Sequence, residues 1–313
     1  MNRLKRYLSA VALLLAIFSL TVLAPHASLP ATSAKSANAT MAVVATAGPA
    51  KAQRSSELTM PGFTVTHGHS VFLPNNNPAA SSNDSNWSGY VDTACTTCHL
   101  RYIGSNFTVP IVECAYSPMG TAGAYADIWV GLDGSPTVEQ IGVQTSCSST
   151  KAAPVYKLFW QMFPTNSNPV YPAGSHPISG GDSVAVSVYY DQSTTDYTMT
   201  FVNKTKGYTY TTPSLLCISG NCYNKTAEAI VEDPGSGVPT YDLDDFEEVP
   251  FSGTTVTSYD GTKGDLCTYP GLWTEGRIDL VDPSGNDMAV PTAIIPCPAT
   301  SPDGFTDNWV RGS

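Results

Sequence analysis

Hydrophobic and polar residues alternate with a period of two along most of the chain after residue 80. In residues 183–190 four large apolar side chains alternate with neighbours that are mostly smaller, and residues 197–202 repeat the pattern. This period places successive side chains on opposite faces of a β-strand. We find no apolar stripe with the 3.6-residue period of a helix.

Further strands are predicted where similar runs lie between Gly, Pro, Asn and Asp residues. They cover 86–92, 103–110, 125–132, 138–144, 155–163, 226–232, 245–250, 277–282 and 288–295. Many short strands without helices predict one all-β domain, either a sandwich or a barrel.

The first 27 residues have the pattern of a cleaved export signal. Three basic residues precede an apolar run over 8–23, and small residues follow it. A membrane anchor is the alternative, but a span needs about 20 apolar residues and flanking charges that stop transfer. We therefore expect a secreted, extracellular protein that leaves the membrane after cleavage.

Residues 28–80 are rich in Ala, Ser, Thr and Pro, which is typical of a flexible linker or a propeptide. Residues 1–80 carry six basic side chains and one acidic one, whereas the remainder carries nine basic and 25 acidic ones. A basic leader can dock on an acidic body, so we favour a propeptide over 28–80 and a folded domain over 81–313.

The composition excludes several classes of protein. Hydrophobic residues make up 42% of the chain and charged residues only 13%, which is not the composition of a disordered chain. The net charge of -11 argues against nucleic acid as a partner, because binding phosphates needs a basic surface.

All eight cysteines lie after residue 94, and the even number favours structural disulfides in an oxidising compartment. A zinc site lacks a second ligand pair, and a redox Cys-x-x-Cys lacks its βαβ context. The expected pairs are Cys95–Cys98, Cys114–Cys147, Cys217–Cys222 and Cys267–Cys297.

Common catalytic motifs are missing: there is no G-x-S-x-G, H-E-x-x-H, D-[TS]-G or phosphate-binding glycine loop. An enzyme with this sequence would use carboxylates and amides, with no cofactor or metal. Such groups concentrate in 127–142, with Asp133, Glu139 and Gln140, and in 227–233, with Glu228 and Glu232.

In a strand, Glu228 and Glu232 lie on one face within an apolar run, where burial raises a carboxyl pKa. A solvent-exposed outer face is the simpler interpretation, but charged residues are scarce here. The two carboxyls of a glycoside hydrolase lie ~5–9.5 Å apart. Residues four apart in a strand have Cα atoms roughly 13 Å apart, so another strand would have to supply the second acid.

Several segments together resemble the glutamic peptidases, or eqolisins, over roughly residues 84–296. The similarity rests on SNWSGY (85–90), WVGLDG (129–134), QIG (140–142), FWQMFP (159–164) and AEAIVE (227–232), in the family's order and approximate spacing.

The resemblance implies a curved, concanavalin-like or lectin-like β-sandwich of two antiparallel sheets with the active site on its concave face. It places the catalytic pair on Gln140 and Glu232, with Glu228 as the alternative for the acid. Expected substrate-binding residues are Trp87, Trp129, Asp133, Phe159, Gln161 and Glu228. The chain departs from the family at Gln161, where an acid is common, and at Ala229, where Trp is common.

We therefore expect a monomeric, secreted, acid-acting endopeptidase that cleaves polypeptides with a water molecule activated by Glu232. A secreted β-sandwich that binds or cleaves glycans is the alternative, with Trp87, Trp129 and Trp160 stacking on sugar rings. A catalytically inactive structural domain is a third possibility, disfavoured by the presence of both Gln140 and Glu232.

Overall fold

A computed structural model describes residues 82–119, 123–134, 137–166, 168–217, 222–234, 242–294 and 304–312, all within the compact unit Thr59–Ser313. These residues form strands and turns, and no helix occurs among them. The all-β prediction is confirmed. The expected signal over 1–27 and leader over 28–80 lie outside the described residues.

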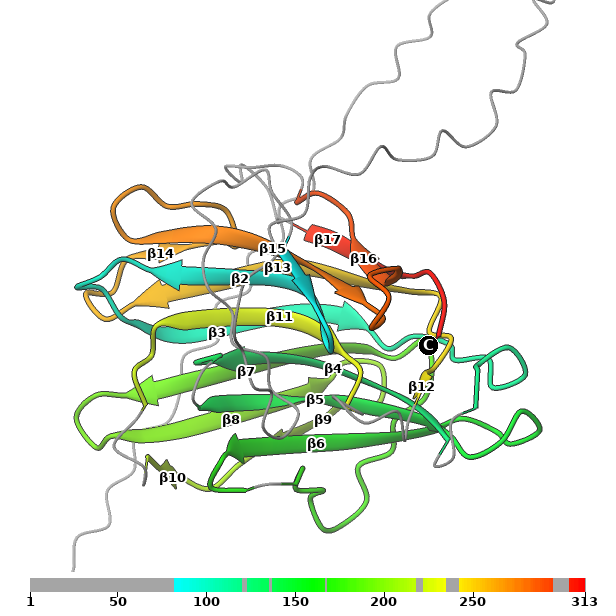
Figure 1. The fold of residues 1–313 in the computed structure, drawn as a ribbon. Coiled ribbons are helices and arrows are strands. Elements are labelled where there is room, and N and C mark those ends of the chain that lie inside the picture. The colour runs from blue at the N-terminus through cyan, green and yellow to red at the C-terminus, as the bar shows by residue number, and fades with distance from the viewer. Residues whose placement is uncertain are drawn as a thin grey trace, which may run out of the picture. The chain divides into compact units, whose positions relative to one another are not determined.

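The first sheet contains most of the predicted site residues. Its order is β1 (Ser82–Asp84), β15 (Trp273–Val281), β2 (Trp87–Ala94), β11 (Thr226–Glu232), β4 (Ala124–Leu132), β5 (Val138–Cys147) and β6 (Val155–Phe163). These neighbours are antiparallel except β1 and β15. The short β12 (Asp242–Leu243) runs parallel to the start of β4. Figure 1 shows β11 lying beside β2.

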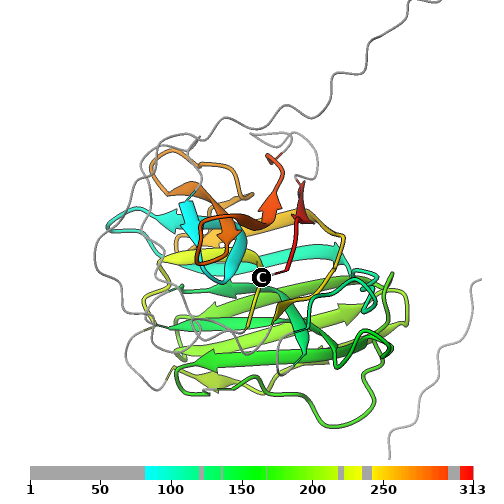
Figure 2. The ribbon, with the colours of Figure 1, turned by 45° about the vertical axis from the view of Figure 1, so that its right-hand side comes forward.

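The second sheet is also mainly antiparallel. Its order is β17 (Gly304–Trp309), β13 (Glu248–Ser258), β3 (Leu100–Thr108), β7 (Ser183–Asp191) and β8 (Asp196–Asn203), with β9 (Tyr208–Thr211) and β10 (Leu215–Leu216) both paired to β8. β14 (Lys263–Gly264) pairs with β13. β16 (Asp287–Pro291) bonds both β15 and β17 and so joins the two sheets (Figure 2).

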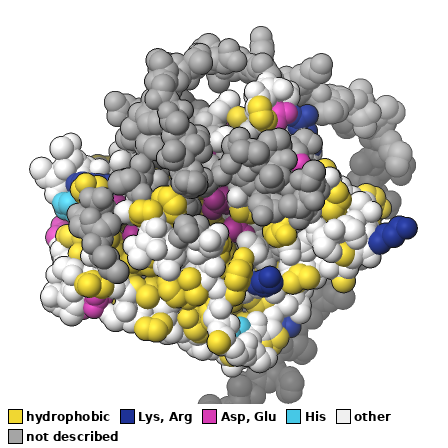
Figure 3. Space-filling model, turned by 60° about the horizontal axis from the view of Figure 1, so that its bottom comes forward, with side chains coloured by type: hydrophobic (Ala, Val, Ile, Leu, Met, Phe, Trp, Pro, Cys, Tyr) yellow, Lys and Arg dark blue, Asp and Glu magenta, His cyan; other side chains and the backbone are white. Residues whose placement is uncertain are grey.

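The main hydrophobic core receives side chains from both sheets. From β11 it takes Ala227, Ala229 and Val231, and from β8 it takes Tyr197, Met199 and Phe201. Along β8 buried and half-buried residues alternate, as the sequence pattern predicts. Where the molecular surface is seen in Figure 3, hydrophobic side chains are interspersed with backbone and with side chains that are neither hydrophobic nor charged, and charged side chains are few, in keeping with the low charge content.

A smaller apolar cluster lies on the opposite face of the first sheet. It consists of Trp87, Val91, Trp129, Val138, Phe159, Ile230 and Ile278, all fully buried. Because strand residues alternate between faces, Ile230 belongs to this cluster while its neighbours Ala229 and Val231 face the main core. We call this side of the first sheet the site face.

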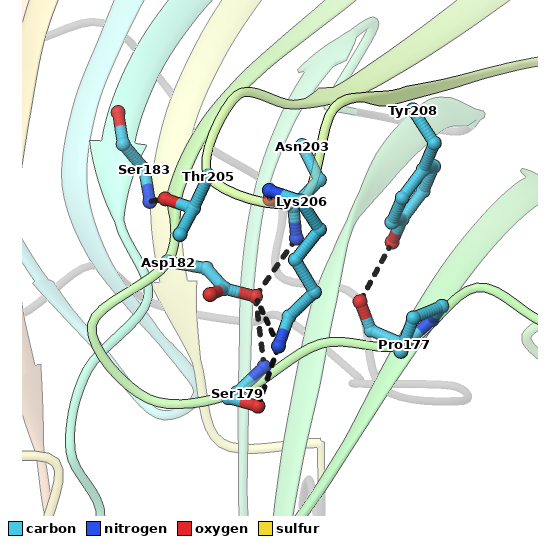
Figure 4. A network of polar contacts seen from close by, with 8 residues as sticks. All are labelled: Pro177, Ser179, Asp182, Ser183, Asn203, Thr205, Lys206 and Tyr208. Carbon is cyan, nitrogen blue, oxygen red and sulfur yellow. Dashed lines mark hydrogen bonds and ion pairs between the residues drawn. The ribbon is translucent and has the colours of Figure 1, made fainter.

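A polar network fixes the entry into β7 in the second sheet (Figure 4). Oδ2 of Asp182 accepts hydrogen bonds from the Ser179 backbone N–H at 2.9 Å and from Nδ2 of Asn203 at 2.8 Å. Nζ of Lys206 lies 3.5 Å from the same oxygen. Through this oxygen Asp182 holds the chain before β7 against the end of β8 and the turn that follows it.

Three predicted disulfides are confirmed: Cys95–Cys98, Cys114–Cys147 and Cys217–Cys222. Cys267 is disulfide-bonded as well, and its predicted partner Cys297 lies outside the described residues. Cys114–Cys147 ties the segment after β3 to the end of β5.

Candidate active site

Strand register arranges the residues of the site face in three cross-strand rows over β11, β4, β5 and β6, with polar side chains in the first and third rows. The first row is Glu228, Gly131, Gln140 and Gln161; the second is Ile230, Trp129, Gly142 and Phe159; the third is Glu232, Asp127, Gln144 and Lys157. Trp87 on β2 extends the third row beside Glu232. The structure thus brings Gln140, Glu228 and Glu232 to one face.

Gln140 is held by a chain of amides. Its Nε2 donates to Oε1 of Gln161 at 2.9 Å, and Nε2 of Gln161 donates to the Asn166 carbonyl at 3.0 Å. Gln140 is 2% exposed, and its Oε1 accepts no hydrogen bond from the part of the chain that the structure describes. One N–H of its NH₂ group is used by Gln161, which leaves the second available to a substrate oxygen.

Glu232 accepts hydrogen bonds from two side chains. Nε1 of Trp129 donates to its Oε2 at 2.8 Å, and Nδ2 of Asn86 donates to its Oε1 at 3.3 Å. Burial raises the pKa of Glu232 well above its usual range, Asp127 raises it further, and the two indoles of Trp129 and Trp87 oppose the rise. The environment therefore favours the protonated acid while still offering donors to the anion.

Trp129 lies between Glu232 and the row of Gln140. Its indole packs edge-to-face on Trp87, with ring centroids 5.1 Å apart. A Cβ on Gly131 would lie 2.8 Å from Cζ3 of Trp129, so the far edge of the indole lies over Gly131. Gly142 is equally constrained, since a Cβ there would lie 1.9 Å from the Ile128 carbonyl oxygen. This explains the glycine of the Q-x-G motif.

Glu228 lies in the row of Gln140 and is completely buried. Burial raises its pKa well above the usual range; the Thr226 hydroxyl opposes this, and Asp133 adds to it. A Cβ on Gly134 would lie 3.3 Å from its Oε1 and 3.4 Å from Cζ3 of Trp87. Glu228 is therefore enclosed by the turn after β4 and by the Trp87 indole.

Asp133 anchors the chain before β11. Its Oδ2 accepts from the Asn224 backbone N–H at 2.6 Å and its Oδ1 from that of Lys225 at 2.7 Å. It has a φ of 61° and is 1% exposed, and burial raises its pKa to about 6 despite these bonds. The contacts give Asp133 a part in positioning β11, and its binding of substrate remains a prediction.

Sequence reasoning missed Asp127 and Gln144, which lie in the row of Glu232. Both are buried, at 3% and 7% exposed. Oε1 of Gln144 accepts a hydrogen bond from the Tyr171 hydroxyl at 2.7 Å. The available signal was parity, because Asp127 is two residues from Trp129 and so shares its face. The sequence analysis also singled out Glu139. It precedes Gln140 in β5 and therefore points to the opposite face of the sheet, away from the site face.

Two further classes of site are not seen in the described residues. No group of three or more His, Cys, Asp or Glu side chains there could hold a metal ion. No helix there is long and apolar enough to cross a membrane.

Comparison with known proteins decides the family. Residues 85–269 match the Peptidase A4 family. The chain belongs to this family. Peptidase A4 is the family of the eqolisins, or glutamic peptidases, so the resemblance found in the sequence is confirmed and the chain is classed as a peptide hydrolase.

Solved structures agree on the fold of this Peptidase A4 member. Scytalido-glutamic peptidase with a transition-state analogue inhibitor is 22% identical, with a TM-score of 0.54, over 72% of this chain and 99% of that one. SCP-B, an eqolisin in complex with the tripeptide Ala-Ile-His, is 20% identical, with a TM-score of 0.50 and the same coverage. A search of curated sequences gives no match.

Proposed function

We propose that this Peptidase A4 member is a secreted, acid-acting endopeptidase in which Glu232 activates a water molecule and Gln140 stabilises the oxyanion. The observation that carries the proposal is the hydrogen bond from Trp129 to Glu232, because the same indole extends across β4 to the row of Gln140. A carboxyl and an amide donor therefore share one face with an aromatic side chain between them.

The chemistry follows from these two groups. Ionised Glu232 takes a proton from water as the water oxygen attacks the scissile carbonyl, and the acid then gives that proton to the leaving amine. General acid–base catalysis of this kind contributes ~10²–10⁴-fold. The free N–H of Gln140 donates to the developing oxyanion, an interaction typically worth about 3–4 kcal/mol. Gln161 keeps the amide of Gln140 oriented.

Glu232 is favoured over Glu228 as the base because of its donors. Trp129 and Asn86 stabilise its anionic form, whereas Glu228 is fully buried beside the Asp133 carboxyl. The register argues in the other direction, since Glu228 shares the row of Gln140 and Glu232 lies four residues farther along β11. We assign the catalytic acid to Glu232, in line with the sequence motif, and keep Glu228 as the alternative.

The glycan-binding alternative loses its main support. Trp87 and Trp129 have no exposed surface and pack on each other, so neither presents a ring face to a sugar.

Digestion of casein at low pH tests the proposal. We expect hydrolysis that resists a metal chelator, pepstatin-type inhibitors and serine-protease inhibitors, and that Glu232→Gln abolishes. Hydrolysis blocked by the chelator, or absent in the wild-type protein at every pH, would contradict it.

A further inference from the structure

Asp127 is a buried carboxyl on the site face that this mechanism does not use. It lies directly opposite Glu232 in the register of β4 and β11, on the same face as Trp129 and Ile230. Directly opposed side chains in antiparallel strands have Cβ atoms about 4.5–5.5 Å apart. Asp127 and Glu232 are 3% and 4% exposed, so little water screens one carboxyl from the other.

The two carboxyls differ in their hydrogen-bond donors. Glu232 receives the N–H groups of Trp129 and Asn86, one on each oxygen. Oδ1 of Asp127 has no hydrogen-bond partner in the described chain, and Gln144 is the one amide that stabilises its anion. Burial and the charge of Asp127 favour a proton on Glu232, but Glu232 has two donors that stabilise its anion and Asp127 has one. On the balance of donors, a pair that holds a single proton keeps it on Asp127 and carries the negative charge on Glu232.

Other charged groups around the pair reinforce this arrangement. The charge of Asp233 raises the pKa of both carboxyls, and the charge of Asp244 raises the pKa of Asp127. Both charges therefore disfavour a second negative charge on the pair. The nearest cation in the same row is Lys157, beyond Gln144, and its Nζ lies 4.8 Å from the centre of the Tyr171 ring. Burial raises the pKa of Asp127 to about 7.

We propose that Asp127 and Glu232 share one proton in the active enzyme, and that loss of the proton from Asp127 sets the upper pH limit of hydrolysis. The proposal rests on the proposed role of Glu232. An amide does not titrate, so Gln140 and Glu232 alone provide a single ionisation, which gives the acid limb of a rate profile. The falling limb at higher pH needs a second ionising group, and Asp127 supplies it.

The charge balance explains why a second ionisation would inhibit. When Asp127 releases its proton to solvent, two anions face each other on the site face, as in other carboxyl pairs whose second proton is held more tightly. The added negative charge opposes formation of the anionic tetrahedral intermediate. Asp127 is thus a positioning residue that acts through Glu232.

Asp127→Asn tests the proposal through the rate profile. Because an Asn amide does not titrate, we expect the upper limb of kcat/KM assigned to Asp127 to be lost, so that the fall in rate begins at least about one pH unit higher than in the wild-type protein. Asp287→Asn, which removes the same charge from an exposed position of β16, should leave both limbs in place. Circular dichroism at each pH separates loss of activity from unfolding. An unmoved upper limb in folded Asp127→Asn, or an equal shift in Asp287→Asn, overturns the proposal.

A second measurement does not depend on activity. In protein labelled with ¹³C at the carboxyls, the apparent pKa of Asp127 should fall by about one unit or more when Glu232 is replaced by Gln. An unchanged titration of Asp127 overturns the sharing even if Asp127→Asn fails to fold. Hydrolysis by Glu232→Gln at a rate close to that of the wild-type protein instead overturns the proposed function, and the titration still reports whether the carboxyls are coupled.

Discussion

The indole N–H of Trp129 donates to Oε2 of Glu232 at 2.8 Å while the opposite edge of that indole lies over Gly131, the cross-strand neighbour of Gln140. One buried side chain therefore links the carboxyl to the row of the amide. Substitutions of Trp129 should alter the chemical step rather than only the packing of the sheet.

Trp129→Phe keeps an aromatic ring and removes the N–H. A hydrogen bond to a charged group is worth about 1.5–3 kcal/mol, so kcat should fall by roughly 10–150-fold. Trp160→Phe is the matched control, because Trp160 lies on β6 and packs against the main core on the other face. Steady-state kinetics with a peptide substrate measure both variants, and equal losses would remove the special role of Trp129.

Gly131→Ala tests the packing of the same indole. The new methyl would lie 2.8 Å from Cζ3 of Trp129, so the indole must shift away from Glu232 or the sheet must distort. We expect a loss of about 1–3 kcal/mol in the free energy of unfolding, as for other overpacked sites, together with lower kcat. Gly134→Ala has its nearest contact at 3.3 Å and should cost less stability. Urea unfolding of the two variants checks the order, and a reversed order would mean that the indole is free to move.

The sequence predicted most of the long strands because their alternation is a local property, but the predicted range 245–250 covers only the start of the longest strand, β13. β7 and β8 have the clearest alternation and match the predicted ranges closely. Short strands such as β10 and β12 have two residues each and carry no period to detect. β17 lies in a polar stretch with few large apolar side chains, so nothing in its pattern distinguished it from a loop.

The site was only partly predictable for a different reason. Parity within a strand placed Glu228 and Glu232 on one face correctly. The neighbours of Glu232 depend on the register between β11 and β4, which brings residue 127 beside residue 232 and cannot be inferred from local pattern. Asp127 was therefore overlooked. Trp129 was singled out as a substrate-binding residue, but its hydrogen bond to Glu232 follows from the same register and was not foreseen.

Stability should be greater in acid than near neutrality. Burial raises the pKa of Asp307 to about 8, and that of Asp127 and Asp244 to about 7. A carboxyl whose pKa is raised in the folded state contributes stability that is fully present below the unfolded value, about 3.9, and is lost as pH rises through the folded value. We expect a higher thermal midpoint at about pH 4 than at about pH 8.

Carboxyls at the surface act in the opposite direction but weakly. Hydrogen bonds lower the pKa of Asp191, Asp260 and Asp282, so their contribution is lost in acid. Asp260 is exposed and the other two are half-buried at the surface, where solvent screens such interactions. Asp307→Asn removes one of the buried carboxyls, and the Asn side chain can still accept the hydrogen bond of the Ser88 hydroxyl. The variant therefore isolates the contribution of that carboxyl to the pH dependence of stability. Between pH 5 and 8 the free energy of unfolding should fall by less in Asp307→Asn than in the wild-type protein, and the difference should exceed about 1.4 kcal/mol, the value of one pKa unit. An unchanged slope would show that Asp307 does not titrate in this range.

The leader should be removed during maturation. The basic segment over 28–80 is expected to bind the acidic domain near neutral pH and to detach when acid neutralises the carboxylates. N-terminal sequencing of secreted protein after acidification should place the mature start near residues 55–85. A fully active chain that still begins near residue 28 would exclude a propeptide.

The assignment of the catalytic acid is tested most directly by kinetics of Glu232→Gln and Glu228→Gln on one peptide substrate at acid pH, with folding of both checked by circular dichroism. We expect kcat to fall by ~10²–10⁴-fold in Glu232→Gln, because general acid–base catalysis usually contributes a factor of this size. Glu228→Gln should keep measurable turnover. An active Glu232→Gln beside an inactive, folded Glu228→Gln would contradict it and assign the acid to the row of Gln140.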